Sequence, residues 1–145
     1  MKKVPFAAAV LAACACMAGN TADAADVIVQ VRGARSDAGN VGCSLFASEK
    51  GFPMDNSGTR QHWVAISQGT ATCRFAGVEP GTYAIAVAHD LNGNRRVDSN
   101  FLGIPTEGWA VSRNVVPMLR APRFDEASFR VEGEAPIVLP LALTH

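Results

Sequence analysis

Oxygen-bearing side chains recur at alternate positions in one short segment of the chain. Counted from Asp90, positions 1, 3, 5 and 9 are Asp90, Asn92, Asn94 and Asp98. Calcium takes about six to eight oxygen ligands, and alternate residues of a tight loop can direct their oxygens toward one centre. The spacing therefore predicts a calcium loop, with the backbone carbonyl of Arg96 at position 7.

The same segment departs from a standard calcium loop at two positions. Position 6 is Arg95 instead of glycine, and position 12 is Phe101 instead of a bidentate glutamate. With two carboxylates and two adjacent arginines, any calcium affinity is expected to lie in the weak range of about 10⁻⁴–10⁻³ M. The alternative is a turn rich in Asp and Asn, whose side chains bond their own backbone. Both interpretations stay open on the sequence alone.

A catalytic interpretation rests on His89 together with Asp90 or Glu107, which would serve as an acid/base pair of a small hydrolase or isomerase. It requires these side chains to converge on one exposed pocket. The chain contains no nucleophile elbow, phosphate-binding loop or zinc-protease motif. A histidine packed beneath a turn is the simpler interpretation, and it favours a non-catalytic module.

The segment 99–125 predicts a long loop with conspicuous apolar residues. Loops of this length in a compact domain are usually functional or disordered, and the aromatic content argues against disorder. Phe101, Glu107 and Trp109, with Met118 nearby, could form a ligand surface or a lid over one end of the fold; the lid is favoured. Trp63 is interpreted as one face of an edge strand.

The elements that position these residues are short strands with period-2 alternation of apolar side chains. About seven such strands, separated by turn signals and without an amphipathic helix, predict a single antiparallel Greek-key β-sandwich of the immunoglobulin-like or transthyretin-like kind. The expected strands cover residues 26–32, 41–46, 61–66, 70–75, 82–89, 127–131 and 137–141.

Two local features refine the sandwich. Tyr83 follows a Pro-Gly turn at the spacing of a tyrosine corner, in which the phenol bonds back to the preceding connection. In the same strand, alanines occupy the face opposite Tyr83, which suggests close packing against another layer.

The N-terminus has the three-part layout of a secretory signal: Lys2-Lys3, an uncharged apolar run, and a small-residue cleavage site ending at Ala24. Removing residues 1–24 leaves a domain, residues 25–145, with net charge −1. Near-neutrality argues against a nucleic-acid partner, and the apolar run is too short for a comfortable membrane span. The alternative is a lipoprotein adaptor anchored through Cys14.

The expected mature chain keeps only Cys43 and Cys73. Both share the parity of the apolar residues around them, so both should point into the core. In the oxidising compartment that an exported chain enters, we expect them to form a structural disulfide.

Several motifs together resemble an exported bacterial family of unknown function, domain of unknown function 2141. The motifs are His89–Asn94, Asp98–Gly108, Leu45-Phe46, Gly51-Phe52-Pro53, Pro80-Gly81-Thr82-Tyr83 and Phe124–Phe129. The chain departs from the family pattern at Arg95-Arg96-Val97, where Gly-Lys-Leu is usual, and at Ala110–Asn114, where a Gly-Phe-Ser-Asn-Asn type string is usual.

The resemblance implies an envelope protein, periplasmic or secreted, without an assigned activity. The Pro-Gly-Thr-Tyr strand is similar to strands of transthyretin-like and carboxypeptidase-regulatory-like sandwiches, which are generally accessory or binding modules. The expected partner is an envelope protein or a small ligand, and calcium, suggested by the spacing of the Asp90–Asp98 loop, is the one cofactor considered.

Overall fold

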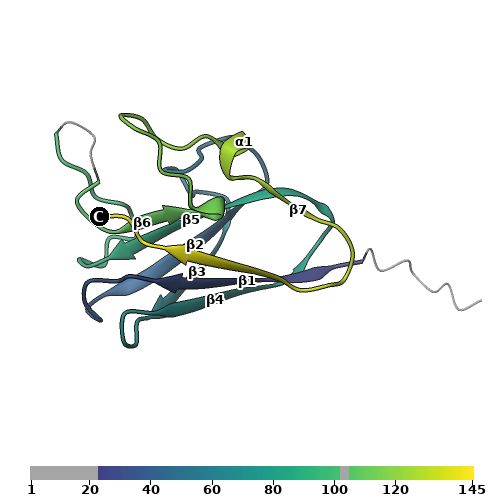
Figure 1. The fold of residues 1–145 in the computed structure, drawn as a ribbon, viewed down its shortest axis with the longest axis horizontal. Coiled ribbons are helices and arrows are strands. Elements are labelled where there is room, and N and C mark those ends of the chain that lie inside the picture. Colours follow the sequence, from purple (N-terminus) through teal and green to yellow (C-terminus); the bar gives the residue numbers. More distant parts are fainter. Residues whose placement is uncertain (1–22, 102–104) are drawn as a thin grey trace, which may run out of the picture.

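The computed structural model describes residues 23–101 and 105–145. Cys14 and residues 1–22 of the predicted export signal lie outside this part of the chain. Two β-sheets pack against each other (Figure 1), which confirms the predicted β-sandwich. The strands are β1 (Ala25–Arg32), β2 (Asn40–Phe46), β3 (Arg60–Ala65), β4 (Ala71–Val78), β5 (Gly81–Asp90), β6 (Trp109–Val111), β7 (Phe129–Val131) and β8 (Ile137–Ala142).

One sheet has the strand order β4-β1-β8, and the other has the order β3-β2-β5-β6, with β7 pairing the remaining length of β5 beside β6. Neighbouring strands are antiparallel except β1 and β8, which run parallel with Val27 opposite Ile137. This parallel pair was not predicted, because the period-2 pattern of a strand carries no information about the direction of its neighbour.

The core lies between the sheets and follows the alternation read from the sequence. In β1, Val27, Val29 and Val31 are buried while the residues between them are partly or fully exposed. Facing residues of the other sheet complete the core, among them Val41, Leu45, Ile85 and Val87.

The disulfide between Cys43 and Cys73 joins the two sheets, as predicted. Cys43 belongs to β2 and Cys73 to β4, both are fully buried, and their Cα atoms lie 6.4 Å apart. The bridge therefore crosses the centre of the sandwich.

The segment 99–125 differs from the predicted long loop. It contains β6, a 3-10 helix η1 (Ser112–Asn114) and the start of α1 (Phe124–Ala127), so Ala127 belongs to a helix and the following strand begins only at Phe129. Neither a three-residue strand nor a four-residue helix is long enough to show a period. Pairing with Ala86–Ala88 of β5 is what makes β6 a strand.

A second, smaller apolar cluster covers one end of the outer face of the five-stranded sheet. Ala84 and Ala127 are fully buried there, with the Phe52 ring 5.9 Å from that of Phe124. The buried Ser112 hydroxyl accepts the N–H of Ile85 and donates to the carbonyl of Ala127, which fixes α1 against β5. Figure 1 shows α1 on the opposite side of the molecule from β1 and β4.

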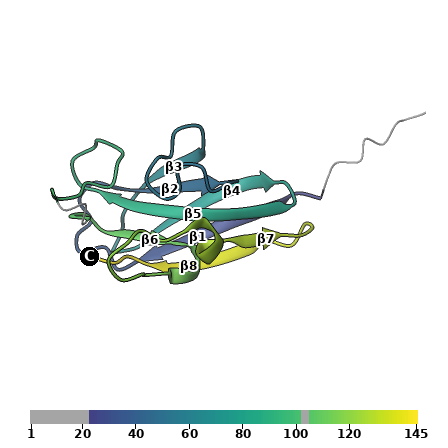
Figure 2. The same ribbon diagram turned by 90° about the horizontal axis from the view of Figure 1, so that it is seen from above.

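The other end of this outer face is bordered by loops and by the C-terminal residues. Figures 1 and 2 both place the C-terminus where β5 leads into the Asp90–Asp98 segment. The Thr144 backbone pairs with that of Trp109 through two hydrogen bonds of 3.0 and 2.7 Å. Across residues 23–101 and 105–145, no helix has the length and apolar character needed to cross a membrane.

Candidate functional site

The Asp90–Asp98 segment folds as a tight loop around the Asp90 carboxylate. Asp90 is 2% exposed, and its two oxygens accept the backbone N–H groups of Gly93 (2.9 Å) and Arg95 (2.7 Å). Arg95 adopts a left-handed conformation with φ of 58°. Calcium loops have glycine at the position of Arg95, and so does the bacterial family that the chain resembles. The backbone at Arg95 therefore has a conformation that glycine would adopt without cost.

The other three predicted ligands do come together, but they bind one another. Asn92 and Asn94 donate their side-chain amides to the two oxygens of Asp98, the latter at 2.6 Å. Their own oxygens accept backbone N–H groups two residues ahead, those of Asn94 and Arg96. This is the bonding of an Asx-rich turn.

A calcium ion would need those oxygens to replace their present donors. Within the part of the chain that the structure describes, no three His, Cys, Asp or Glu side chains are grouped so that they could hold a metal ion. The hydrogen bonds of the loop are those of an Asx-rich turn, and calcium binding stays a prediction.

Glu107 has a structural position that the sequence did not suggest. It is 7% exposed, and its carboxylate accepts the N–H of Leu91 at 3.1 Å and that of Asp98 at 3.2 Å. Glu107 thus links the two ends of the Asp90–Asp98 loop through its carboxylate. Phe101 was predicted to form a ligand surface with Glu107. It is 95% exposed and does not line the cavity on the outer face of the five-stranded sheet.

His89 does not have the environment that the hydrolase hypothesis requires. It is 2% exposed, and its Nε2 lies 2.8 Å from the carbonyl oxygen of Ala38. Asp90 and Glu107 are also buried and occupied by backbone donors. These groups do not converge on an exposed pocket.

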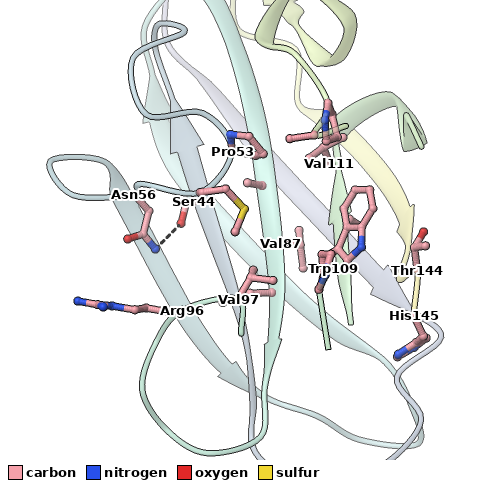
Figure 3. A pocket seen from close by; sticks show the side chains of 18 of the residues that line it. Ser44, Pro53, Asn56, Val87, Arg96, Val97, Trp109, Val111, Thr144 and His145 are labelled. Carbon is pink, nitrogen blue, oxygen red and sulfur yellow. Dashed lines mark hydrogen bonds between the residues drawn. The ribbon is translucent and has the colours of Figure 1, made fainter. Parts of the chain in front are cut away.

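A cavity of about 580 Å³ lies instead on the open end of the outer face of the five-stranded sheet (Figure 3). Trp109, the third residue of the predicted ligand surface, lines it together with Trp63. These are the two tryptophans of the sequence. Met118, the other candidate from the long loop, is exposed and does not line it.

The strand register explains why a cavity forms at this place. Trp63 of β3 pairs with Gly42 of β2, Gly42 pairs with Ala88 of β5, and Ala88 pairs with Trp109 of β6. Side chains at paired positions project from the same face of a sheet. The row therefore places a large ring at each side and two small residues between them, spanning roughly 14 Å over three interstrand steps.

The next row extends the low floor. Ser44 pairs with Ala86, so two more small side chains lie between the walls. The Trp63 ring leans over Gly42, where an added Cβ would come within 2.4 Å of the ring. Glycine at this position therefore permits the inward tilt of Trp63.

Polar contacts hold the β3 side of the cavity in place. Asn56 donates its amide to the Ser44 hydroxyl at 3.3 Å, the contact drawn in Figure 3, and to the Gln61 side chain at 3.4 Å. The Trp63 indole N–H also donates to Gln61, at 3.2 Å. Gln61 thus holds both the Trp63 ring and the loop that contains Asn56.

Prolines are frequent in the loops that form the rim. Pro53 comes from the loop after β2, Pro105 from the loop after β5, and Pro117 and Pro122 from the segment before α1. Since proline fixes φ, these rim segments sample few backbone conformations.

The charge of the lining is one-sided. Among the residues that the structure describes, three arginines line the cavity, Arg95, Arg96 and Arg120, and no Asp or Glu side chain does. Asp55 lies nearby and accepts hydrogen bonds from the hydroxyl and the N–H of Ser57. These bonds hold the pKa of Asp55 below its usual value, and the charges of Lys50 and Arg96 lower that pKa further.

Sequence reasoning missed most of this cavity. The alanines of β5 were interpreted as packing against another layer; Ala84 and Ala86 do pack in the second apolar cluster, but Ala86 and Ala88 also form the floor of the cavity. Trp63 does lie on an edge strand, as predicted, but its ring forms a wall of the cavity. The sequence does contain a pattern that could have predicted the floor of the cavity, because small residues occupy alternate, outward-facing positions of the adjacent strands β2 and β5.

Comparison with known proteins adds a family and no ligand. The family model described as an uncharacterized protein conserved in bacteria (DUF2141) matches residues 29–138, from β1 to β8. No curated protein and no solved structure shows significant similarity to the chain. The match includes both tryptophan walls and the floor between them, and the chain therefore belongs to this bacterial family, as the sequence motifs had suggested.

Proposed function

We propose that this protein is an exported, non-catalytic β-sandwich module that binds a small ligand in the cavity between Trp63 and Trp109. The observation that carries the proposal is the cavity itself. Its volume of about 580 Å³ lies within the roughly 300–1,000 Å³ of small-molecule sites. Its mixture of apolar walls with a few polar groups also fits such sites.

The lining supports binding more than catalysis. Ser44 is the buried hydroxyl at the floor, and its described partner is the Asn56 amide, which donates to it and is not a base. His145 lies at the edge with its Nε2 2.9 Å from the Gly33 carbonyl. A nucleophile activated by a base would need a different arrangement.

Two observations support export. The disulfide between Cys43 and Cys73 suits an oxidising compartment. In addition, β1 begins at Ala25, directly after the proposed cleavage site, and Ala25 is already buried and paired with Val78.

Mass spectrometry of the N-terminus should find a chain starting at Ala25, whereas a lipidated Cys14 would support the lipoprotein alternative.

The binding proposal can be tested with an uncharged aromatic probe. N-phenylnaphthylamine should bind the purified domain, with energy transfer from Trp63 and Trp109, because both tryptophans line the cavity. An Ala86→Leu variant fills the floor and should abolish the transfer. The matched control is Ala76→Leu, the same change at an exposed position of β4 in the other sheet.

Circular dichroism and thermal unfolding should show that both variants fold. If Ala86→Leu fails to fold, Ala88→Leu serves as the second floor-filling variant. Absence of probe binding to the wild-type domain, or unchanged binding by a folded floor-filling variant, would overturn the proposal.

A further inference from the structure

We infer that the ligand of this cavity is a small organic anion with a flat apolar body. The inference rests on the proposed function, since it specifies what the Trp63–Trp109 cavity binds. Three features of the cavity carry it: the charge of the rim, the fixed position of one arginine, and the shape between the two tryptophans.

The rim carries three arginines whose charge nearby carboxylates offset only in part: Arg96 is close enough to Asp55 to lower the pKa of that carboxyl. Arg120 is paired with Glu126 through two hydrogen bonds of 2.9 and 2.6 Å. Within residues 23–101 and 105–145, neither Arg95 nor Arg96 makes an ion pair. The acidic groups of the adjacent loop, Asp90 and Asp98, accept hydrogen bonds inside that loop and do not line the cavity.

Arg95 is held at the cavity by the Asp90 carboxylate, which accepts its N–H, and by Trp63, although its backbone conformation is unfavourable. Its φ of 58° is one that non-glycine residues adopt at a cost. Its guanidinium lies 5.7 Å from the centroid of the Trp63 ring. Stacking on Trp63 holds the cation beside the aromatic wall, where it satisfies no carboxylate and can donate to a bound anion.

Arg96 marks the entrance on the opposite side from Trp109. Figure 3 shows its side chain at the rim, with the guanidinium directed outward, away from Trp109. A cation in this position attracts an approaching anion.

The interior selects an apolar body with a flat shape. Two indole rings border a floor of small side chains, Ser44, Ala86 and Ala88, so the space above this floor suits a thin aromatic or polycyclic group. Indole rings stack favourably on other flat π systems. The anionic group of such a ligand would remain at the rim, next to Arg95.

Two probes that differ by one sulfonate group test the inference. Anilinonaphthalene sulfonate and N-phenylnaphthylamine share the same aromatic body, and energy transfer from the tryptophans reports both. Wild type should bind the sulfonate more tightly than the neutral probe. An Arg95→Gln/Arg96→Gln double variant should weaken sulfonate binding about fivefold to tenfold, the effect of two charges at an exposed rim, and change neutral-probe binding less than twofold.

The matched control is Arg35→Gln, an exposed arginine outside the cavity, which should leave both affinities unchanged. Equal binding of the two probes by wild type, or equal loss of both in the double variant, would overturn the anion inference while leaving the cavity as a binding site. Failure of both probes to bind wild type would instead overturn the proposed function. Single Arg95→Gln and Arg96→Gln variants serve if the double variant does not fold.

Discussion

Arg95 connects the loop after β5 to the candidate site. Its backbone N–H is accepted by the buried carboxylate of Asp90, and its guanidinium stacks over Trp63. The left-handed conformation is the geometry that glycine adopts without cost. The chain therefore carries local backbone strain at the residue whose cation lies beside Trp63.

Replacing Arg95 separates the cost of this conformation from the contribution of its side chain. Arg95→Gly and Arg95→Ala both remove the stacking on Trp63, but only glycine removes the penalty of a Cβ at positive φ. We expect Arg95→Gly to be more stable than Arg95→Ala by about 1 kcal/mol, measured as the free energy of unfolding in urea. Equal stability of the two variants would contradict the strained-backbone account.

At the scale of elements, the loop that contains Asp90–Asp98 is held by its own hydrogen bonds and by Glu107. The Glu107 carboxylate accepts the N–H groups of Leu91 and Asp98, which border the loop on both sides. The loop therefore has internal substitutes for the contacts that a bound cation would provide.

Calcium should accordingly leave the stability of the protein unchanged. We expect the same midpoint of thermal unfolding in several millimolar calcium and after metal removal, since the oxygens of Asp98 are occupied by Asn92 and Asn94. A saturated site at 100 times its dissociation constant would add about 2.7 kcal/mol. A calcium-dependent rise that an Asp98→Ala variant lacks would establish the ion site and reverse this interpretation.

The short helix α1 depends on one carboxylate. Glu126 accepts hydrogen bonds from the Arg120 guanidinium and the Arg123 backbone N–H, and these contacts lower its pKa from 4.5 to about 2. A carboxyl whose pKa is lower in the folded state stabilises the fold above its unfolded pKa. This contribution is therefore present above about pH 4.5 and is lost as the pH falls toward about 2.

This loss is measurable at the residue. The carboxyl carbon of Glu126 should titrate by NMR near pH 2, and the amides of α1 should lose protection over the same range. A Glu126→Gln variant should remove this pH dependence of α1. A Glu126 titration near 4.5 would show that the ion pair with Arg120 does not persist in solution.

At the scale of the whole molecule, the disulfide is the covalent link between the sheets. Cys43 and Cys73 are separated by 30 residues and are both buried in the shared core. On the chain-entropy model, closing a loop of this length stabilises the fold by about 3–4 kcal/mol.

A Cys43→Ala/Cys73→Ala variant should lose at least this amount in the free energy of unfolding, determined by urea denaturation. Wild type unfolded under reducing conditions should approach the variant, because both lack the cross-link. A variant within about 1 kcal/mol of the oxidised wild type would show that core packing alone joins the sheets.

The β-sandwich could be predicted from the sequence because its core strands are long enough to show the alternation of apolar and polar residues. Val27, Val29 and Val31 face inward in the structure as the sequence predicts. β6 and α1 could not be predicted in the same way, since three or four residues do not complete a period. β6 pairs with the backbone of β5, and α1 is held by the Ser112 hydroxyl of η1.

The candidate site was predictable only in part, for a related reason. Trp109 was recognised as a ligand-surface residue, whereas Phe101 and Glu107, grouped with it by proximity in sequence, are directed to solvent and into the loop. Trp63 lies 46 residues before Trp109, and only the register of β3, β2, β5 and β6 places the two rings on one face.

The sequence by itself determined the inward alternation of the strands, the pairing of Cys43 with Cys73 and the family, because each depends on local pattern or on a few distinctive residues. The tertiary structure alone decided that Gly42 and Ala88 would separate two tryptophans. Cross-strand register is set by hydrogen bonds between distant segments, and no local pattern encodes it. The cavity, on which the proposed function rests, is therefore a property of the sheet and not of any one segment.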